Sequence, residues 1–417
     1  MRIQANQETF RSYVFFWSGQ LASLLGSSIA QFVIIWWVTI ETGNAMYLAL
    51  AAFLGLAPMV ILGPFAGVLA DRWNRKKLIG VVDFLQALAT LVLVLLFRFG
   101  IVSIWHVFVL LTLRGVFQAF HQPAVSAITP SMVPKEKLSR MNGLNYLFSG
   151  AVNMIGPIVG AFLLIFWQIY DILWIDVATF LIAVVPLLIV AIPSVKMEKG
   201  NSSFKQDFSD GFSFIRNARG LLPLLFVATM LNFLLTPLST LLPYYVKFDH
   251  LGDASAFALI MASFEGGILI GGLIMSLLKG FKRKMVANTL AIFAVFLGYA
   301  FVALTPTSWF WLMAISGLFM ALFVPVANVT LQTIMQTTVP LNMQGRVFSV
   351  TMALAMAAQP AGIILSGTIA VLTGTANLFL ACAAFGMLTM TLAWFFTDIR
   401  HVEKATEPAF SSEQPPT

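Results

Sequence analysis

Long apolar segments separated by short polar breaks run along nearly the whole chain. Each holds about 20 residues or more, enough for an α-helix to cross a hydrocarbon core of about 30 Å. Glycine and proline breaks and clusters of charge divide the chain into twelve candidate spans. Their approximate limits are 12–40, 45–70, 78–98, 104–128, 140–167, 169–192, 220–246, 254–279, 285–304, 308–335, 346–372 and 375–397. This pattern predicts an all-α polytopic membrane protein.

Composition supports this interpretation. The 417 residues are 59% hydrophobic and only 10% charged, with a mean hydropathy of +0.90, whereas soluble domains carry about 25% charged residues. The formal net charge is +7, but most cations lie in loops beside the spans, so they indicate topology rather than nucleic-acid binding. A single cysteine excludes an intrachain disulfide. The N-terminal apolar stretch has no small-residue cleavage site, which predicts a retained first span.

Nearly all Lys and Arg residues fall on one side of the predicted membrane, including those at 72–77, 135–140 and 279–284. The opposite side has only Arg98 and Lys247. By the positive-inside rule the heavily charged side is cytoplasmic, and both termini lie there. The sequence therefore predicts a multi-pass protein of a prokaryotic cytoplasmic membrane.

The two halves of the chain resemble each other at an offset of about 202–209 residues, and 115–123 aligns with 317–325. Such a repeat is typical of transporters built from two parallel six-helix units, with a site near the midplane between them. We therefore expect two pseudo-symmetric six-helix bundles, at 1–192 and 220–399. A connecting segment at 193–219 joins them, and a tail at 400–417 follows.

The connecting segment predicts an amphipathic helix, because Phe204, Phe208, Phe212 and Ile215 recur at helical spacing. It could lie along the membrane interface or pack on the bundle as an ordinary surface helix. The tail after Arg400 is polar, and we expect it to be disordered.

Charged residues crowd the segment 67–77, between the second and third spans. Because they cannot lie in hydrocarbon, the segment predicts a short loop at the membrane face. Gly67, Asp71, Arg72 and Arg75 resemble the signature motif between the second and third helices of the major facilitator superfamily. The resemblance implies a gate in which Asp71 engages the start of the eleventh span, where a helix N-terminus carries partial positive charge.

Other motifs support the same resemblance. The segments at 114–118 and 156–160 resemble the superfamily's second motif and its antiporter motif, and 39–46, 63–64 and 345–349 resemble the macrolide-efflux type of exporter. The antiporter motif consists of Gly156, Pro157 and Gly160. The resemblance implies the major facilitator fold of twelve helices in two six-helix bundles, and proton coupling at Arg114.

Ionisable residues within the spans are candidates for proton transfer. Glu265 lies near the middle of 254–279 with no cation within a turn, so it could gain and lose a proton, or it could be a permanently paired structural acid. Arg114, with Gln118 and His121 on the same face, could act in proton transfer or substrate contact, or tie the fourth span to the first.

Two further acids lie within the spans, and we expect structural or solvated roles for them. Asp83 could pair with an arginine of the 67–77 segment or be a solvated acid at a helix end. Asp176 lies nearer the outer end of its span, and we expect it to reach interfacial water.

Polar stripes at helical spacing mark the first, seventh and tenth spans, and they indicate either a central cavity or hydrogen bonds between helices. The residues predicted to line the cavity, with one from the fourth span, are Gln20, Ser27, Gln31, Gln118, Asn232, Thr236, Asn328 and Gln332.

The function favoured by these features is export of lipophilic or amphiphilic, macrolide-type compounds by proton antiport with alternating access. Movement of an amphiphilic lipid such as a lysophospholipid is the alternative, a nutrient importer comes third, and a non-transporting receptor or scaffold is remote. No P-loop motif, metal-spaced cluster or nucleophile elbow occurs in the sequence, so we expect no ATP hydrolysis, cofactor, metal or enzymatic activity. The expected partners are a small amphiphilic substrate, protons and the lipid bilayer, with the protein acting as a monomer.

Overall fold

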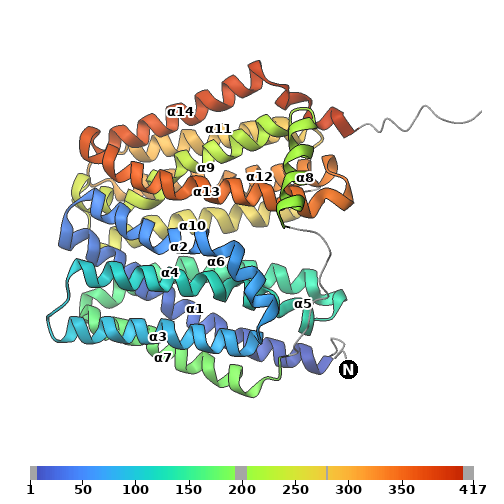
Figure 1. Ribbon diagram of the computed structural model, residues 1–417. Helices are drawn as coiled ribbons and strands as arrows, with labels where there is room; N and C mark the ends of the chain where they lie inside the picture. The colour runs from blue at the N-terminus through green and yellow to red at the C-terminus, as the bar shows by residue number, and fades with distance from the viewer. Residues whose placement is uncertain (1–6, 193–203, 279, 407–417) are drawn as a thin grey trace, which may run out of the picture.

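The computed structural model describes residues 7–192, 204–278 and 280–406. A few side chains inside the helices, including those of 67–72, lie outside that description. Figure 1 shows a bundle of long helices that run roughly alongside one another.

The first half of the chain forms six long helices and one short helix. They are α1 (Gln7–Thr42), α2 (Ala45–Arg72), α3 (Arg75–Arg98), α4 (Ile104–Ser126), α5 (Thr129–Met132), α6 (Lys135–Phe166) and α7 (Ile169–Ile189).

The second half repeats this pattern after a connecting helix. Its elements are α8 (Phe204–Asn217), α9 (Leu221–Tyr244), the π-helical turn η1 (Tyr245–Asp249), α10 (Ala254–Leu277), α11 (Lys284–Ala303), α12 (Phe310–Thr338), α13 (Leu341–Thr373), α14 (Thr375–Phe396) and the 3₁₀ segment η2 (Asp398–Thr406). Among the described residues, 12 helices are long and apolar enough to cross a membrane. The predicted all-α polytopic fold is confirmed.

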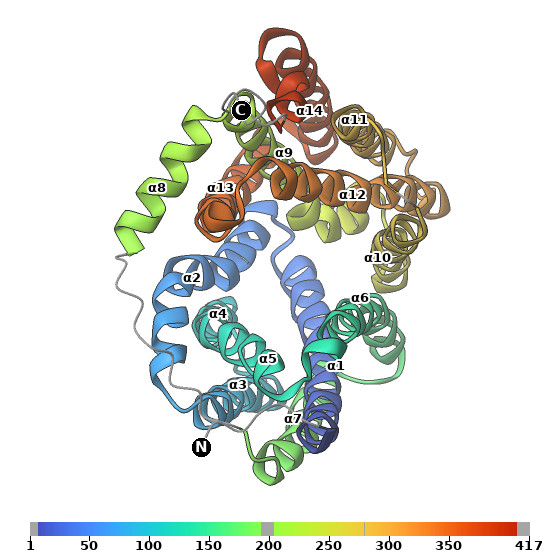
Figure 2. The same cartoon turned by 90° about the vertical axis from the view of Figure 1, so that its right-hand side faces the viewer.

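One end of the bundle holds the start of α1, the end of α14, and the helices α5 and α8 (Figure 1). We name this end the terminal face. Figure 2 looks onto this face, with the helices of the second half in its upper part and those of the first half below. The other end is named the opposite face.

The charged segment at 67–77 is shorter as a loop than the sequence predicts. Helix α2 continues to Arg72 and α3 begins at Arg75, so the connection is only Trp73 and Asn74. The Asn74 side chain accepts a hydrogen bond from the Lys77 backbone nitrogen at 3.2 Å and caps α3. An asparagine cap satisfies a backbone N–H that the helix leaves free, which allows so tight a turn.

The prediction of a disordered tail is wrong for residues 400–406, which belong to η2. Ile399 and Val402, three residues apart, are both fully buried. Gly220, at φ +76°, lets the chain pass so close that an added Cβ would meet Asp398 and Val402. At 3₁₀ spacing these two apolar side chains share one face of the segment, and that face packs on the bundle. Residues 407–417 lie outside the described part of the chain.

The amphipathic helix of the connecting segment is present as α8, and it packs against α13 (Figure 2). Ile215 is fully buried, and Gly211 lies so close to α13 that a Cβ would overlap the Arg346 carbonyl. Asp210 forms an ion pair with Arg346 at 3.2 Å. These contacts favour the packed alternative for this helix.

The two halves meet through aromatic and small residues toward the opposite face. Phe257 of α10 stacks on Phe32 and Trp36 of α1, with ring centroids 5.2 and 5.8 Å away. Gly367 of α13 packs so closely on Ala49 of α2 that an added Cβ would have to displace it. Small residues permit this approach of helix backbones.

Candidate functional site

A cavity of about 690 Å³ lies between the two halves of the bundle. Helices α1, α2, α3, α4, α6 and α7 form its wall on one side, and α9, α10 and α13 form it on the other. Its ionisable lining residues are Asp83, Arg114, His121, Asp176 and Glu265. A cavity with apolar walls and a few convergent polar groups is the usual form of a small-molecule site.

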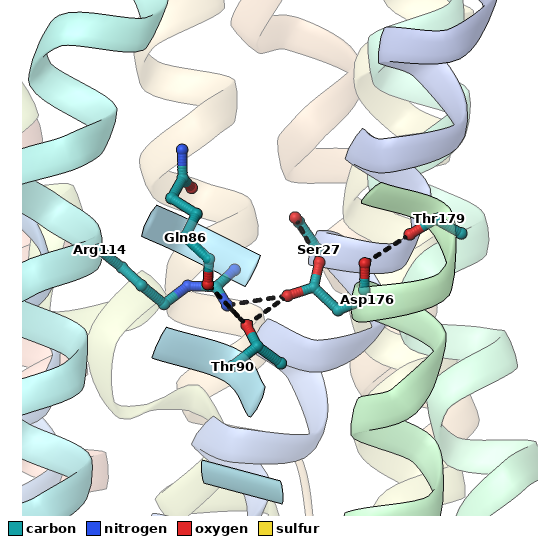
Figure 3. A network of polar contacts seen from close by, with 6 residues as sticks. All are labelled: Ser27, Gln86, Thr90, Arg114, Asp176 and Thr179. Carbon is teal, nitrogen blue, oxygen red and sulfur yellow. Dashed lines mark hydrogen bonds and ion pairs between the residues drawn. The ribbon is translucent and has the colours of Figure 1, made fainter. Parts of the chain in front are cut away.

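Arg114 of α4 lies in a polar network with α3 and α7 (Figure 3). Its Nη1 contacts the Asp176 Oδ2 at 3.0 Å and donates to the Thr90 Oγ1 at 2.6 Å. The Thr90 hydroxyl donates to the same carboxylate oxygen, and Ser27 of α1 donates to the Asp176 Oδ1 at 2.7 Å. The arginine is thus neutralised by a carboxylate that itself has partners on three helices.

The expectation that Asp176 reaches interfacial water is wrong, because the residue is only 5% exposed. It sits near the start of α7 in sequence, but α7 packs along α1 and α3 and turns the carboxylate inward. A mid-span arginine requires a compensating acid in the interior. The presence of Arg114 within a span was therefore a sign, in the sequence itself, that an acid of a neighbouring span lies inside the bundle.

Asp83 forms a second polar contact in the cavity wall. Its Oδ1 lies 2.9 Å from the His121 Nε2, and Gln20 donates to its Oδ2 at 3.4 Å. Asp83 is buried, so neither expected alternative, an arginine partner or full solvation, describes it. The position of Asp83 in the sequence suggested an acid near a helix end. In the structure, α3 packs against α4, and His121 of α4 contacts the Asp83 side chain.

Glu265 of α10 is the ionisable group that the second half contributes to the cavity. Its side chain is partly buried. In contrast to the two acids of the first half, it makes no hydrogen bond or ion pair with any residue of the described ranges. The alternative of a permanently paired structural acid therefore finds no partner for this carboxyl within those ranges.

The glycines of the antiporter motif lie where α6 crosses α1. A Cβ at Gly156 would overlap the Ser28 hydroxyl, and one at Gly160 would lie 2.8 Å from the Phe32 ring. Pro157, inside α6, lines the cavity. Close packing on α1 gives a physical reason for glycine at these two positions.

Four of the eight predicted cavity residues, all from the first half, line this cavity: Gln20, Ser27, Gln31 and Gln118. The other four, Asn232, Thr236, Asn328 and Gln332, are not among its described lining residues.

The surroundings of these four residues differ between helices. Thr236 is buried against Gly362 of α13 and donates to the Asn232 carbonyl, so it serves packing. The Asn232 side-chain amide donates a hydrogen bond to the Ala228 carbonyl within its own helix. Asn328 and Gln332 are exposed on α12. Helical spacing shows that side chains share a face, but not which way that face points.

The predicted gating residues have separate outcomes. Arg75 is buried and its Nη1 donates to the Ala127 carbonyl at 2.8 Å, which ties α3 to the end of α4. The side chains of Gly67, Asp71 and Arg72 lie outside the described residues.

Comparison with known proteins identifies the family. The model for the Major Facilitator Superfamily matches residues 16–359 and 249–417. Macrolide efflux protein A of Streptococcus pyogenes is 31% identical over 93% of this chain and 96% of its own length. The chain belongs to the Major Facilitator Superfamily. Multidrug efflux pump Tap of Mycolicibacterium fortuitum is 25% identical over 92% of this chain and 95% of that protein.

Solved transporters share the fold of this superfamily member. A bacterial homologue of the iron transporter ferroportin, in its inward-facing state, covers 92% of this chain and 98% of its own with a TM-score of 0.71 and 15% identity. A POT family transporter in complex with 5-aminolevulinic acid gives a TM-score of 0.73 at 11% identity, covering 93% of this chain and 96% of its own. The protein is therefore a multi-pass transporter of a bacterial cell membrane, similar to macrolide-efflux proteins over nearly its whole length.

Proposed function

We propose that this transporter exports lipophilic or amphiphilic, macrolide-type compounds by proton antiport with alternating access. The observation that carries the proposal is the cavity between the halves, in which Glu265 has no partner among the described residues while the two acids of the first half have partners. The efflux proteins that the chain resembles supply the substrate class.

Glu265 is the proposed proton carrier. A carboxylate without a cation partner in an apolar wall is costly, so taking up a proton relieves that cost and releasing it requires access to water. Rocking of the two halves would alternate that access, because Glu265 lies on the second half and the rest of the cavity's charge on the first. Arg114 then contributes fixed positive charge, and its pairing with Asp176 keeps the first half's wall electrically balanced.

Asp71 is the proposed latch of the gate, with Gly67, Arg72 and Arg75 as the rest of its motif. Its target is the N-terminal end of α13, where Asp210 of α8 already pairs with Arg346, the sixth residue of that helix. A second carboxylate arriving at this helix start would be stabilised by the same cation and by the helix dipole.

We further propose that the terminal face is cytoplasmic and that the monomer is the working unit. The excess of Lys and Arg at that face supports the orientation. Single cysteines placed at Lys282 and at Lys247, in a Cys382→Ser background, would label from opposite sides of sealed vesicles if the orientation holds.

The test of proton coupling is Glu265→Gln, which keeps the shape of the side chain and removes its charge. In proteoliposomes with an imposed pH gradient, we expect macrolide uptake to fall by about 100-fold, the size of effect of losing an essential proton-transfer group. Exchange of labelled for unlabelled substrate without a gradient should continue, because binding and rocking remain.

Glu41→Gln is the matched control, since Glu41 is an exposed acid outside the cavity, and it should leave gradient-driven uptake unchanged. Undiminished uptake by Glu265→Gln would rule out the proton role. A panel containing lysophospholipids tests the substrate class, and transport of lysolipid alone would replace the drug proposal.

A further inference from the structure

A second pocket, separate from the central cavity, opens at the terminal face beside the last helix. It has a volume of about 550 Å³ and lies where α14 ends at Phe396 and α9 begins at Leu221. Both helices are candidate membrane spans. The pocket therefore sits at the level where the chain passes from the hydrocarbon core to the polar boundary.

The wall of this pocket is strongly basic. Arg216, Arg219 and Arg400 line it, against a single acid, Asp398. Asp398 is already engaged, because Arg219 donates to its Oδ1 at 3.2 Å. That hydrogen bond holds the pKa of Asp398 below its ordinary value, so the acid remains charged and stays with Arg219.

The other two arginines are exposed, and neither makes a hydrogen bond or ion pair within the described ranges. Two other cations of the same face bind backbone carbonyls of the fold. The Lys76 Nζ donates to the carbonyls of Leu188 and Val190 at 2.8 Å, and Arg75 donates to a carbonyl of α4. Arg216 and Arg400 share one pocket and have no protein partner among the described residues, so the pocket carries positive charge that suits a ligand of negative charge.

The rim of the pocket is apolar. Phe395 and Phe396, the last residues of α14, are 66% and 81% exposed, and Leu222 at the start of α9 is also exposed. An inorganic anion would make no favourable contact with these apolar side chains. A molecule with a charged head and acyl chains would place the head among the arginines and the chains along these side chains.

We propose that this pocket binds the headgroup of an anionic phospholipid, with Arg216 and Arg400 contacting the phosphate and Phe395 and Phe396 contacting the acyl chains. Arginine suits this role because its guanidinium pairs with phosphate through two hydrogen bonds. The lipid would join the connection between the halves, at 216–222, to the end of the last span. It would stabilise this corner of the bundle without entering the transport path.

The test is a lipid titration of the purified full-length protein in detergent, followed by native mass spectrometry. Phosphatidylglycerol, phosphatidylcholine and soluble glycerol phosphate are the three probes. We expect the first phosphatidylglycerol to bind about 10-fold or more tightly than phosphatidylcholine, because a pair of cations near an anionic lipid contributes at least that much. Soluble glycerol phosphate should bind much more weakly than phosphatidylglycerol, since it lacks the chains.

The variant Arg216→Gln with Arg400→Gln should lose about 25-fold in affinity for phosphatidylglycerol, about 5-fold for each cation. Its affinity for phosphatidylcholine, in which the choline cation offsets the phosphate charge, should fall by a smaller factor. Lys282→Gln with Arg283→Gln removes two exposed cations from the same face outside the pocket, and this control should keep the wild-type affinity within about 2-fold.

Three results would overturn the proposal. The pocket variant could bind phosphatidylglycerol as well as the wild type does, or the control pair could lose as much affinity as the pocket pair, which would indicate general surface attraction. Glycerol phosphate could bind as tightly as the lipid, which would make the pocket a simple anion site. A further variant, Phe395→Ser with Phe396→Ser, should weaken binding of the lipid but not of glycerol phosphate.

Discussion

The two sides of the central cavity differ in how they hold charge. The first half contributes two acids, Asp83 and Asp176, and each has a basic partner within 3.0 Å. The second half contributes one acid, Glu265, which has no partner among the described residues. The first half therefore presents a fixed wall, in which both acids have partners, and the second half presents an acid without a partner among the described residues.

Equivalent helix pairs of the repeat show the same contrast. In the first half α3 and α4 are joined by the contact of two ionisable side chains, Asp83 and His121. In the second half α11 and α12 are joined by a neutral one, in which the Asn288 Nδ2 donates to the Ala327 carbonyl at 2.8 Å and the Thr330 Oγ1 at 3.0 Å. Both copies of the repeat have a polar contact at this place, and only the first-half copy forms it from ionisable side chains.

The largest effect is expected from breaking the balanced pair. Arg114→Gln leaves Asp176 buried and charged without its cation, and should lower the free energy of unfolding by about 3–5 kcal/mol. Unfolding in mixed micelles by a denaturing detergent would measure it. Replacing both partners, with Arg114→Met and Asp176→Leu, should recover most of that loss. A loss below about 1 kcal/mol for the single variant would contradict the fixed-wall interpretation.

A smaller effect should separate the equivalent ties. Asp83→Ala removes the acceptor of both His121 and Gln20, and should cost about 1–3 kcal/mol. Asn288→Ala removes two neutral hydrogen bonds and should cost about 1 kcal/mol, because such bonds contribute about 0.6 kcal/mol each in membranes. Equal losses in the same unfolding assay would remove the distinction between the halves at this position.

The smallest effect concerns the opposite face, where the second half holds a neutral group in place. His250 is buried, its Nδ1 has no hydrogen-bond partner, and its ring lies 4.4 Å from that of Tyr245. Burial lowers the pKa of His250 below its ordinary value of 6.5, against the opposing effect of a hydrogen bond with the Pro306 backbone.

The sign of the pH dependence follows from this shift. Below the ordinary value the unfolded chain takes up a proton that the folded protein resists, so stability is complete above that value and falls as the pH drops toward the folded pKa. The melting temperature of the wild type should fall on acidification, and His250→Gln should show a shallower dependence. The difference between the two profiles is the measurement, since other groups titrate in both, and parallel profiles would contradict the prediction.

The sequence by itself determined the class, the number of spans and the superfamily of this protein. A bilayer accepts a crossing segment only when it is long, apolar and internally hydrogen-bonded, so hydropathy reports the spans directly. The loop motif around Asp71 and the Gly156-Pro157 motif are contiguous in sequence, and they indicated the family before any contact was known. The polar face of α1 was also visible from spacing alone, and its Gln20, Ser27 and Gln31 line the cavity.

Only the tertiary structure decided which charges have partners. Arg114 and Asp176 are 62 residues apart, and His121 meets Asp83 through the crossing of α4 and α3. It also showed that Asn328 and Gln332 are not among the described lining residues of the cavity and that Ile399 and Val402 pack on the bundle. Helical periodicity assigns residues to a face, but the direction of that face depends on the rotation and crossing of whole helices. Pairing of charges depends on that rotation, which no single span encodes.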